Sequence, residues 1–267
     1  MQSKTKKVQE KEYNKEPKKG YKTLLWAIGL TIWVGVAFFV AQLIVVLVTR
    51  WLAGVFGFSL ESTVTQTVSS AFAYILALAI IVLVPKKVVG MKTTRGEIGV
   101  RGLPTWTDIL LSIVGYIVSI IVSILIVAMM PGVDWGQEQD VGYSAANVIS
   151  NMDRIITFVA LAVLAPIAEE LIFRGFLYGK LRSRLNAFWA ILLVSVLFGF
   201  MHGQWNVAII VGIMSVFMCL AREITGTIYA GILMHMIRNG IAFYALFVWG
   251  GGSGVGMALP LLAAFLI

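Results

Sequence analysis

Residues 153–175 read DRIITFVALAVLAPIAEELIFRG, an apolar run that ends on two glutamates and an arginine. A helix needs about 20 apolar residues to cross the hydrocarbon core of a bilayer. A charge near the centre of such a helix costs about 2.5–3.5 kcal/mol on insertion scales, so it needs a partner or a task. This stretch therefore predicts a membrane-spanning helix that carries a polar site.

The composition of the whole chain indicates the same fold class. Of its 267 residues, 59% are hydrophobic and only 13% are charged, and the mean hydropathy is +0.91, outside the range of soluble domains. Apolar runs predict spans at 23–49, 64–84, 107–130, 153–173, 187–202, 206–221, 225–247 and 257–267. We therefore expect an all-α, polytopic integral membrane protein with about eight transmembrane helices around an intramembrane polar cavity.

The distribution of basic residues predicts the domain organisation and the orientation. Residues 1–22 are rich in lysine and are expected to form a basic cytoplasmic tail, and 23–267 a single transmembrane domain. Most other basic residues fall in 85–104, 174–186 and 222–224, which lie on the same side of the predicted membrane. By the positive-inside rule that side is cytoplasmic and holds both termini. The tail and the short loops favour a bacterial plasma membrane.

The net charge of +8 is explained by this bias and by attraction to anionic lipid, so the expected partner is the lipid bilayer and not nucleic acid. Cys219 is the only cysteine, which rules out a disulfide framework or a cysteine metal site within the chain.

The chain has two histidines, and both lie in or beside apolar runs. Histidine is the side chain best suited to proton transfer near neutral pH, so these positions predict chemistry within the membrane.

The first group of polar residues within the spans lies in 165–175. On a helix, Glu170 and Arg174 share one face and can pair, whereas Glu169 points about 100° away and is available as a general base. Pro166 lacks an N–H and should kink the helix and open backbone carbonyls to a cavity. The alternative is that these charges extend to the surface from a cytoplasmic helix end.

Two further groups have the same four-residue spacing, which places their members on one helical face. Phe198 precedes His202 in the first, and His235 precedes Asn239 in the second. His202 alone is also compatible with an interfacial role beside Trp205. The second group is harder to explain structurally, because polar residues in mid-membrane are costly unless they face a polar cavity.

Together, the patterns Glu169-Glu170-x-x-x-Arg174, Phe198-x-x-x-His202 and His235-x-x-x-Asn239 resemble, in order, the three motifs of the CAAX protease and bacteriocin-processing (CPBP) family. The resemblance covers about residues 104–247 and uses both histidines of the chain. It implies an intramembrane endopeptidase that acts on membrane-associated peptides or proteins. These substrates would be prenylated CAAX-type proteins or precursors in bacteriocin maturation and self-immunity.

The resemblance also implies roles for the motif residues. Glu169 and His202 would activate a water molecule, and His235 and Asn239 would stabilise the oxyanion. The supporting residues of the site would be Glu170, Arg174 and Phe198. Amide hydrolysis needs a base for water and donors for the developing oxyanion, and these residue types supply both.

The family has also been described as metalloproteases, and this alternative stays open. Glu169, His202 and His235 would be the ligands of a Zn²⁺ ion with one open position for water. The sequence has no HExxH motif, however, and the asparagine of the third motif suits hydrogen bonding better than zinc binding. We therefore expect a mechanism without a cofactor, with Zn²⁺ as the alternative.

Two rival functions use the same helices without proteolysis. One is a non-catalytic membrane immunity or scaffold protein. The other is a small-solute transporter with a proton relay, which would predict related halves of the chain that are not visible in the sequence. Arg238 is not required by the family pattern, and it is expected either to pair with Glu169 or to bind a substrate carboxylate.

The predicted span limits conflict with the predicted mechanism. They place Glu169 near the cytoplasmic end of one helix and His202 near the opposite end of the next, too far apart to share a water. Either the limits are wrong by a turn or two, or residues 175–202 are sunk and tilted in the membrane. Helix limits are the least reliable part of a sequence-based prediction, so we give the motifs more weight.

Overall fold

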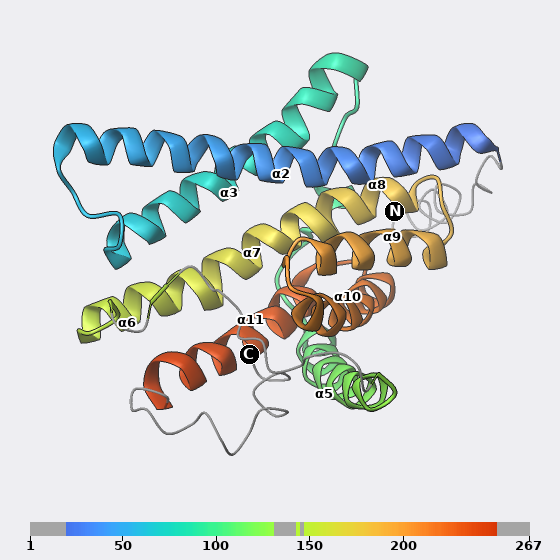
Figure 1. The fold of residues 1–267 in the computed structure, drawn as a ribbon. Coiled ribbons are helices and arrows are strands. Elements are labelled where there is room, and N and C mark those ends of the chain that lie inside the picture. The colour runs from blue at the N-terminus through green and yellow to red at the C-terminus, as the bar shows by residue number, and fades with distance from the viewer. Residues whose placement is uncertain (1–19, 131–142, 145–146, 250–267) are drawn as a thin grey trace.

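The computed structural model describes residues 20–130, 143–144 and 147–249, and the regular structure in these ranges is entirely helical (Figure 1). The long helices are α2 (Tyr21–Phe56), α3 (Thr63–Val89), α5 (Trp106–Ala128), α10 (Trp205–Thr225) and α11 (Tyr229–Phe243), which continues as the π-helix η3 (Tyr244–Trp249). The shorter helices are α4 (Arg95–Ile98) and α9 (Ala187–Phe200).

One long helix, which we call the central helix, alternates between α and π geometry from Asn151 to Arg182. Its segments are α6 (Asn151–Phe158), η1 (Val159–Leu164), α7 (Ala165–Glu170), η2 (Leu171–Leu177) and α8 (Tyr178–Arg182). π-Helical turns are rare in proteins, and those that do occur are often found at functional sites. The first motif lies in α7 and η2.

Six helices in the described ranges are long and apolar enough to cross a membrane, which confirms the all-α, polytopic membrane fold. They include the central helix, and the sixth comprises α11 with η3. The predicted span at 187–202 corresponds to α9, which has only 14 residues. The predicted span at 257–267, the tail before residue 20 and the glycine-rich stretch at 250–256 lie outside the described residues.

Local sequence signals set several helix ends. Thr105 and Ser150 form capping boxes with Asp108 and Asp153, three residues further on, at the starts of α5 and the central helix. At the C-terminal end of α10, Gly226 adopts a φ of 71°, which residues with a side chain rarely do.

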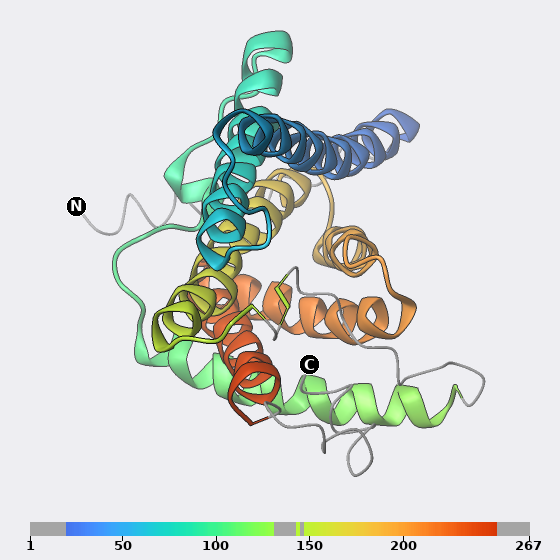
Figure 2. The same ribbon diagram turned by 60° about the vertical axis from the view of Figure 1, so that its left-hand side comes forward.

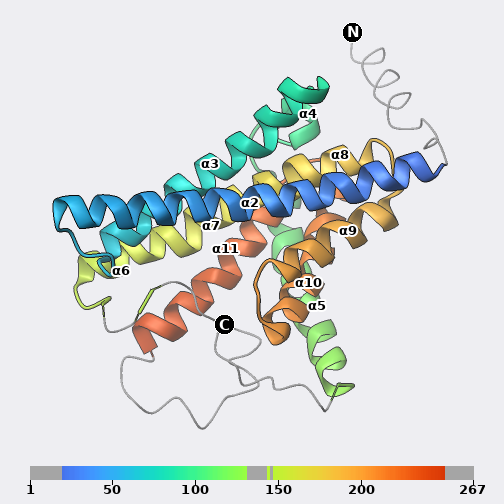
Figure 3. The same ribbon diagram turned by 45° about the horizontal axis from the view of Figure 1, so that its top comes forward.

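The helices pack in layers around the central helix. Figure 2 shows α2 and α3 on one side of it, α10 and α11 on the other, and α5 beyond them. α9 packs mainly on α10 and also contacts α2, which crosses over the central helix in Figure 3. The largest buried apolar cluster joins α2, α3, η2, α9 and α10. All three motifs therefore lie on helices that meet in the interior of the bundle.

The structure corrects the predicted limits of the first-motif helix. The apolar pattern predicts that this span ends at 173 and that Arg174 lies in a basic loop, but Arg174 is fully buried within η2. Its charge does not end the span because Glu170 pairs with it at 2.7 Å. The helix therefore continues to Arg182, and the turn to α9 comes nine residues later than predicted.

This correction resolves the conflict between span limits and mechanism. Glu169 precedes the turn, and His202 follows it at the far end of α9. At 1.5 Å of rise per helical residue, each lies about 20 Å along its own helix from the turn, so the helix limits no longer place the two residues at opposite ends of the membrane. The short α9 brings the second motif only as far into the bundle as the first.

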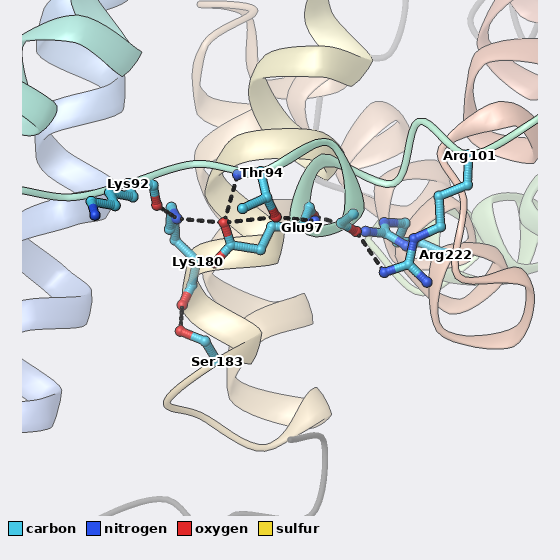
Figure 4. Close-up of polar contacts among 8 residues, drawn as sticks. Lys92, Thr94, Glu97, Arg101, Lys180, Ser183 and Arg222 are labelled. Carbon is cyan, nitrogen blue, oxygen red and sulfur yellow. Dashed lines mark hydrogen bonds and ion pairs between the residues drawn. The ribbon is translucent and has the colours of Figure 1, made fainter. Parts of the chain in front are cut away.

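The connection between α3 and α5 is tied to the end of the central helix (Figure 4). The Nζ atom of Lys180 donates to the Oε2 atom of Glu97 at 3.0 Å and also to the carbonyl of Lys92. The Nη2 atom of Arg222 donates to the carbonyl of Glu97 at 2.9 Å. α4 thereby links α8 to the end of α10 and fixes the ends of two helices that carry or contact the motifs.

Candidate active site

Glu169 reaches away from the arginine of its own motif, as the helical geometry predicted. Its Oε1 atom accepts a hydrogen bond of 2.6 Å from the hydroxyl of Tyr74 on α3. Its Oε2 atom lies 3.9 Å from the Nε2 atom of His235 on α11. The side chain is 15% exposed, so it lies inside the bundle but is not sealed. Three helices therefore hold and surround this carboxylate.

Glu170 is the buried structural partner in the pair. Its Oε1 atom accepts from the Nη1 atom of Arg174 at 2.7 Å, and neither side chain is exposed. The same oxygen lies 3.5 Å from the Nδ1 atom of His235. His235 thus lies between the two glutamates of the first motif.

A glycine on α11 makes this close packing possible. A Cβ atom at Gly231 would lie 2.5 Å from the Oε2 atom of Glu170, closer than real Cβ contacts. Gly231 precedes His235 by four residues, on the same face of the helix. The absence of a side chain there lets α11 approach the central helix until the histidine reaches both glutamates.

Phe198 places the second motif against the other two. Its fully buried ring contacts the rings of His202 and His235, with centroid distances of 5.1 Å and 5.7 Å. The guanidinium of Arg174 lies 4.3 Å from the centre of the same ring, a cation–π contact. One aromatic ring thus touches both histidines and the arginine.

The hydrogen bond made by His202 defines its protonation pattern. Its Nδ1 atom lies 2.8 Å from the carbonyl of Phe198, one turn earlier. A carbonyl only accepts, so Nδ1 carries the proton, and the Nε2 atom of the neutral ring is then an acceptor. The arrangement leaves His202 able to receive a proton at Nε2.

Asn239 is one turn beyond His235 and makes contacts of its own. Its Nδ2 atom donates to the carbonyl of Leu161 in η1 at 2.9 Å, and its Oδ1 atom accepts from Arg238 at 3.2 Å. One of its N–H groups is therefore used by the protein backbone. The third motif therefore contacts the central helix at two places, at α7 through His235 and at η1 through Asn239.

Arg238 is 95% buried and lines a narrow pocket between α5, α10 and α11. The other lining residues are Tyr116, Ser119, Ile120, Ser123, Ile210 and Met214. Arg238 is also close enough to interact electrostatically with Glu169 and His202. The pocket is therefore next to the site, on its α5 side.

The predicted residues thus fall into one cluster with one outlying member. The ring of Phe198 contacts Arg174, His202 and His235, and His235 in turn lies beside Glu169 and Glu170. Asn239 extends from this cluster toward η1. Tyr74 was not predicted, because nothing in the sequence of its span marks it as a partner of a residue 95 positions away.

The alternative zinc ligands do not form a metal-binding group in this arrangement. Zinc ligands converge at about 2.0–2.2 Å from the ion for nitrogen and oxygen. In the ranges that the structure describes, no three His, Cys, Asp or Glu side chains are grouped closely enough to hold a metal ion. The mechanism without a metal stays a prediction, which chelation tests.

Comparison with known proteins agrees with the motifs. Residues 151–241 match the family of type II CAAX prenyl endopeptidase Rce1-like proteins, and this range contains all seven motif residues. A Bacillus subtilis (strain 168) protein with the provisional name membrane peptidase YdiL is 28% identical over 104 residues, which are 39% of this chain and 42% of that protein. The chain therefore aligns with less than half of that relative's length.

No solved structure matches the chain significantly. The family match begins at the first residue of the central helix and ends on α11, two residues after Asn239. α2, α3 and α5 lie outside the match, although Tyr74 of α3 contacts the site. Residues 151–241 are therefore similar to the Rce1-like type II CAAX prenyl endopeptidases, in agreement with the order of the three motifs.

Proposed function

We propose that the protein is an intramembrane endopeptidase that hydrolyses peptide bonds in membrane-associated or lipidated substrates. The position of Glu169 is the observation that best supports this function. Tyr74 fixes one of its carboxylate oxygens, and the other faces His235 without reaching hydrogen-bond distance. A carboxylate that is held by one oxygen and has the other oxygen available to a water molecule suits a general base.

In the proposed reaction, the oxygen of a water attacks the carbonyl carbon of the substrate peptide bond. The water proton passes to Glu169, with the acceptor nitrogen of His202 helping to orient the water. The same proton then passes to the leaving amide nitrogen as the C–N bond breaks. Glu169 is thus restored as a carboxylate, and the products are a carboxylic acid and an amine.

The remaining motif residues shape this site. An imidazole between two carboxylates can carry a proton on each ring nitrogen, and we assign the N–H on the Glu169 side of His235 to the oxyanion. The family resemblance gives Asn239 the same task. The buried pair of Glu170 and Arg174 holds the ring of His235 through Glu170 and the ring of Phe198 through the cation–π contact.

Two substrate classes suit a membrane site of this kind. One is a prenylated protein that is cut near its C-terminus, as the family description suggests. The other is a bacteriocin or signalling-peptide precursor in a bacterial plasma membrane, with both termini of the enzyme in the cytoplasm. An uncut precursor accumulates in the membrane when the protease is inactive, and the identity of that precursor, prenylated or not, separates the two classes.

The substrate can be found by comparing membrane peptides from cells with the wild-type protein and cells with Glu169→Ala. We expect one or a few membrane-associated precursors to accumulate in the variant, each extended beyond the same cleavage site. Purified wild-type protein in proteoliposomes should then cut the accumulated precursor. Identical peptide profiles in the two kinds of cell would contradict a protease and favour the immunity or scaffold protein.

The metal-free mechanism predicts that a chelator does not abolish activity. Protein purified in a strong chelator and dialysed into metal-free buffer should keep more than about half of its activity, because carboxylate and imidazole alone move the protons. A zinc enzyme should instead lose its activity and recover it on addition of Zn²⁺. The zinc content of the same samples, measured by atomic emission, shows whether the metal was removed.

A further inference from the structure

The carbonyl of Leu161 occupies a place in the central helix where the backbone supplies no donor. In η1, the N–H of Ala165 donates to the carbonyl of Ala160, five residues earlier, as in a π-helix. The same pattern would assign the N–H of residue 166 to Leu161, but Pro166 has none. The α-helical donor would be Ala165, whose N–H is already directed at Ala160.

Asn239 supplies the missing donor from α11. Its Nδ2 atom donates to the carbonyl of Leu161 at 2.9 Å. Its Oδ1 atom accepts from the Nη1 atom of Arg238, which fixes the orientation of the amide. In a membrane interior an unmatched carbonyl is costly, so this hydrogen bond should hold the two helices together.

The bond lies one helical turn from the reacting groups. Asn239 and His235 are four residues apart on α11, and His235 contacts both glutamates of the central helix. The central helix and α11 are therefore joined at α7 through His235 and at η1 through Asn239. A shift at the second contact would move His235 relative to Glu169.

We propose that Asn239 is a positioning residue, which binds the carbonyl left open by Pro166 and so holds His235 against Glu169. The activity readout of this inference rests on the proposed endopeptidase function. It differs from the role that the family resemblance gives to Asn239, because an oxyanion donor acts on the substrate and not on Leu161. The two roles predict different behaviour when Pro166 is changed.

The test combines Asn239→Ala with Pro166→Ala in the full-length protein in proteoliposomes. Asn239→Ala alone should lower kcat on the order of 100-fold, as expected for a misplaced reacting group. Pro166→Ala restores an N–H that can serve Leu161, which weakens the bond to Asn239 and lowers kcat by itself. In the Pro166→Ala background, Asn239→Ala should lower kcat by less than a further factor of about three, because the bond to Asn239 is already weakened there.

Pro85→Ala is the matched control, because Pro85 is also a buried proline within a helix, in α3, away from Leu161. In this background, Asn239→Ala should keep its full effect on kcat. A direct oxyanion donor would instead give the same loss in all three backgrounds, and that result would overturn the proposal.

Thermal unfolding in detergent gives a second readout that does not depend on turnover. Asn239→Ala should lower the unfolding midpoint, because the carbonyl of Leu161 then has no donor, and Pro166→Ala should reduce this difference. An unchanged midpoint in Asn239→Ala would overturn the proposal even if Pro166→Ala fails to fold. If wild-type and Glu169→Gln proteins both lack cleavage, the proposed function fails, while the midpoints still test the bond.

Discussion

Replacing Glu169 by glutamine should lower the rate of peptide-bond hydrolysis by about 10²–10⁴-fold, the contribution typical of a general base. Glutamine cannot take a proton from water at neutral pH. Its amide oxygen can still accept the hydrogen bond from Tyr74, so the packing between the central helix and α3 should persist. The measurement is kcat/KM on the accumulated precursor in proteoliposomes.

The control for this substitution is Glu61→Gln, at an exposed position before α3. It makes the same chemical change outside the site and should leave both turnover and the unfolding midpoint near wild-type values. Glu169→Gln protein that folds normally and still cleaves at the wild-type rate would remove Glu169 from the mechanism. A cellular phenotype that survives the loss of cleavage would point to the scaffold function.

Arg174→Ala should destabilise the protein by about 3–5 kcal/mol, because it leaves the carboxylate of Glu170 buried without its ion-pair partner. The substitution also removes the cation–π contact to Phe198. Unfolding in detergent, followed by circular dichroism, should show a large fall in the midpoint. Arg184→Ala is the control, since Arg184 is exposed and its guanidinium lies over the ring of Trp26.

A double variant separates stability from activity. In Glu170→Leu with Arg174→Leu, both charges are replaced by apolar groups, which often restores the stability that a single replacement removes. Activity should stay low, because His235 has lost the carboxylate 3.5 Å from its Nδ1 atom. If the double variant is as active as wild type, the buried pair has no role in holding His235.

Helical periodicity is enough to predict that Glu169 and Glu170 point in different directions, about 100° apart. The i, i+4 pair of Glu170 and Arg174 is present at 2.7 Å, and Glu169 points to other helices. Pro166 indicates open carbonyls in the same helix, and the structure shows the carbonyl of Leu161 bound by Asn239 of α11. Such local signals depend only on the spacing along one helix, which the sequence contains in full.

Features that depend on contacts between helices could not be predicted in the same way. Hydropathy scores each charge alone and so places Arg174 in a loop, whereas its ion pair with Glu170 makes it compatible with a buried helix. Tyr74 reaches Glu169 from a helix 95 positions earlier. In the π segments the N–H of residue i+5 donates to the carbonyl of residue i, whereas an α-helix uses residue i+4, and the apolar pattern of 159–164 is compatible with both.

The length of α9 has a consequence for the surrounding lipid. With 14 residues, this helix is about 21 Å long, whereas the hydrocarbon core of a bilayer is about 30 Å thick. A helix that is too short for its bilayer is accommodated by hydrophobic mismatch, in which lipid thins locally and headgroups move inward. Because α9 ends just before His202, this thinning would bring the hydrated interface toward the residues proposed to activate water. The supply of the second reactant in the hydrolysis would then be set by the length of one helix.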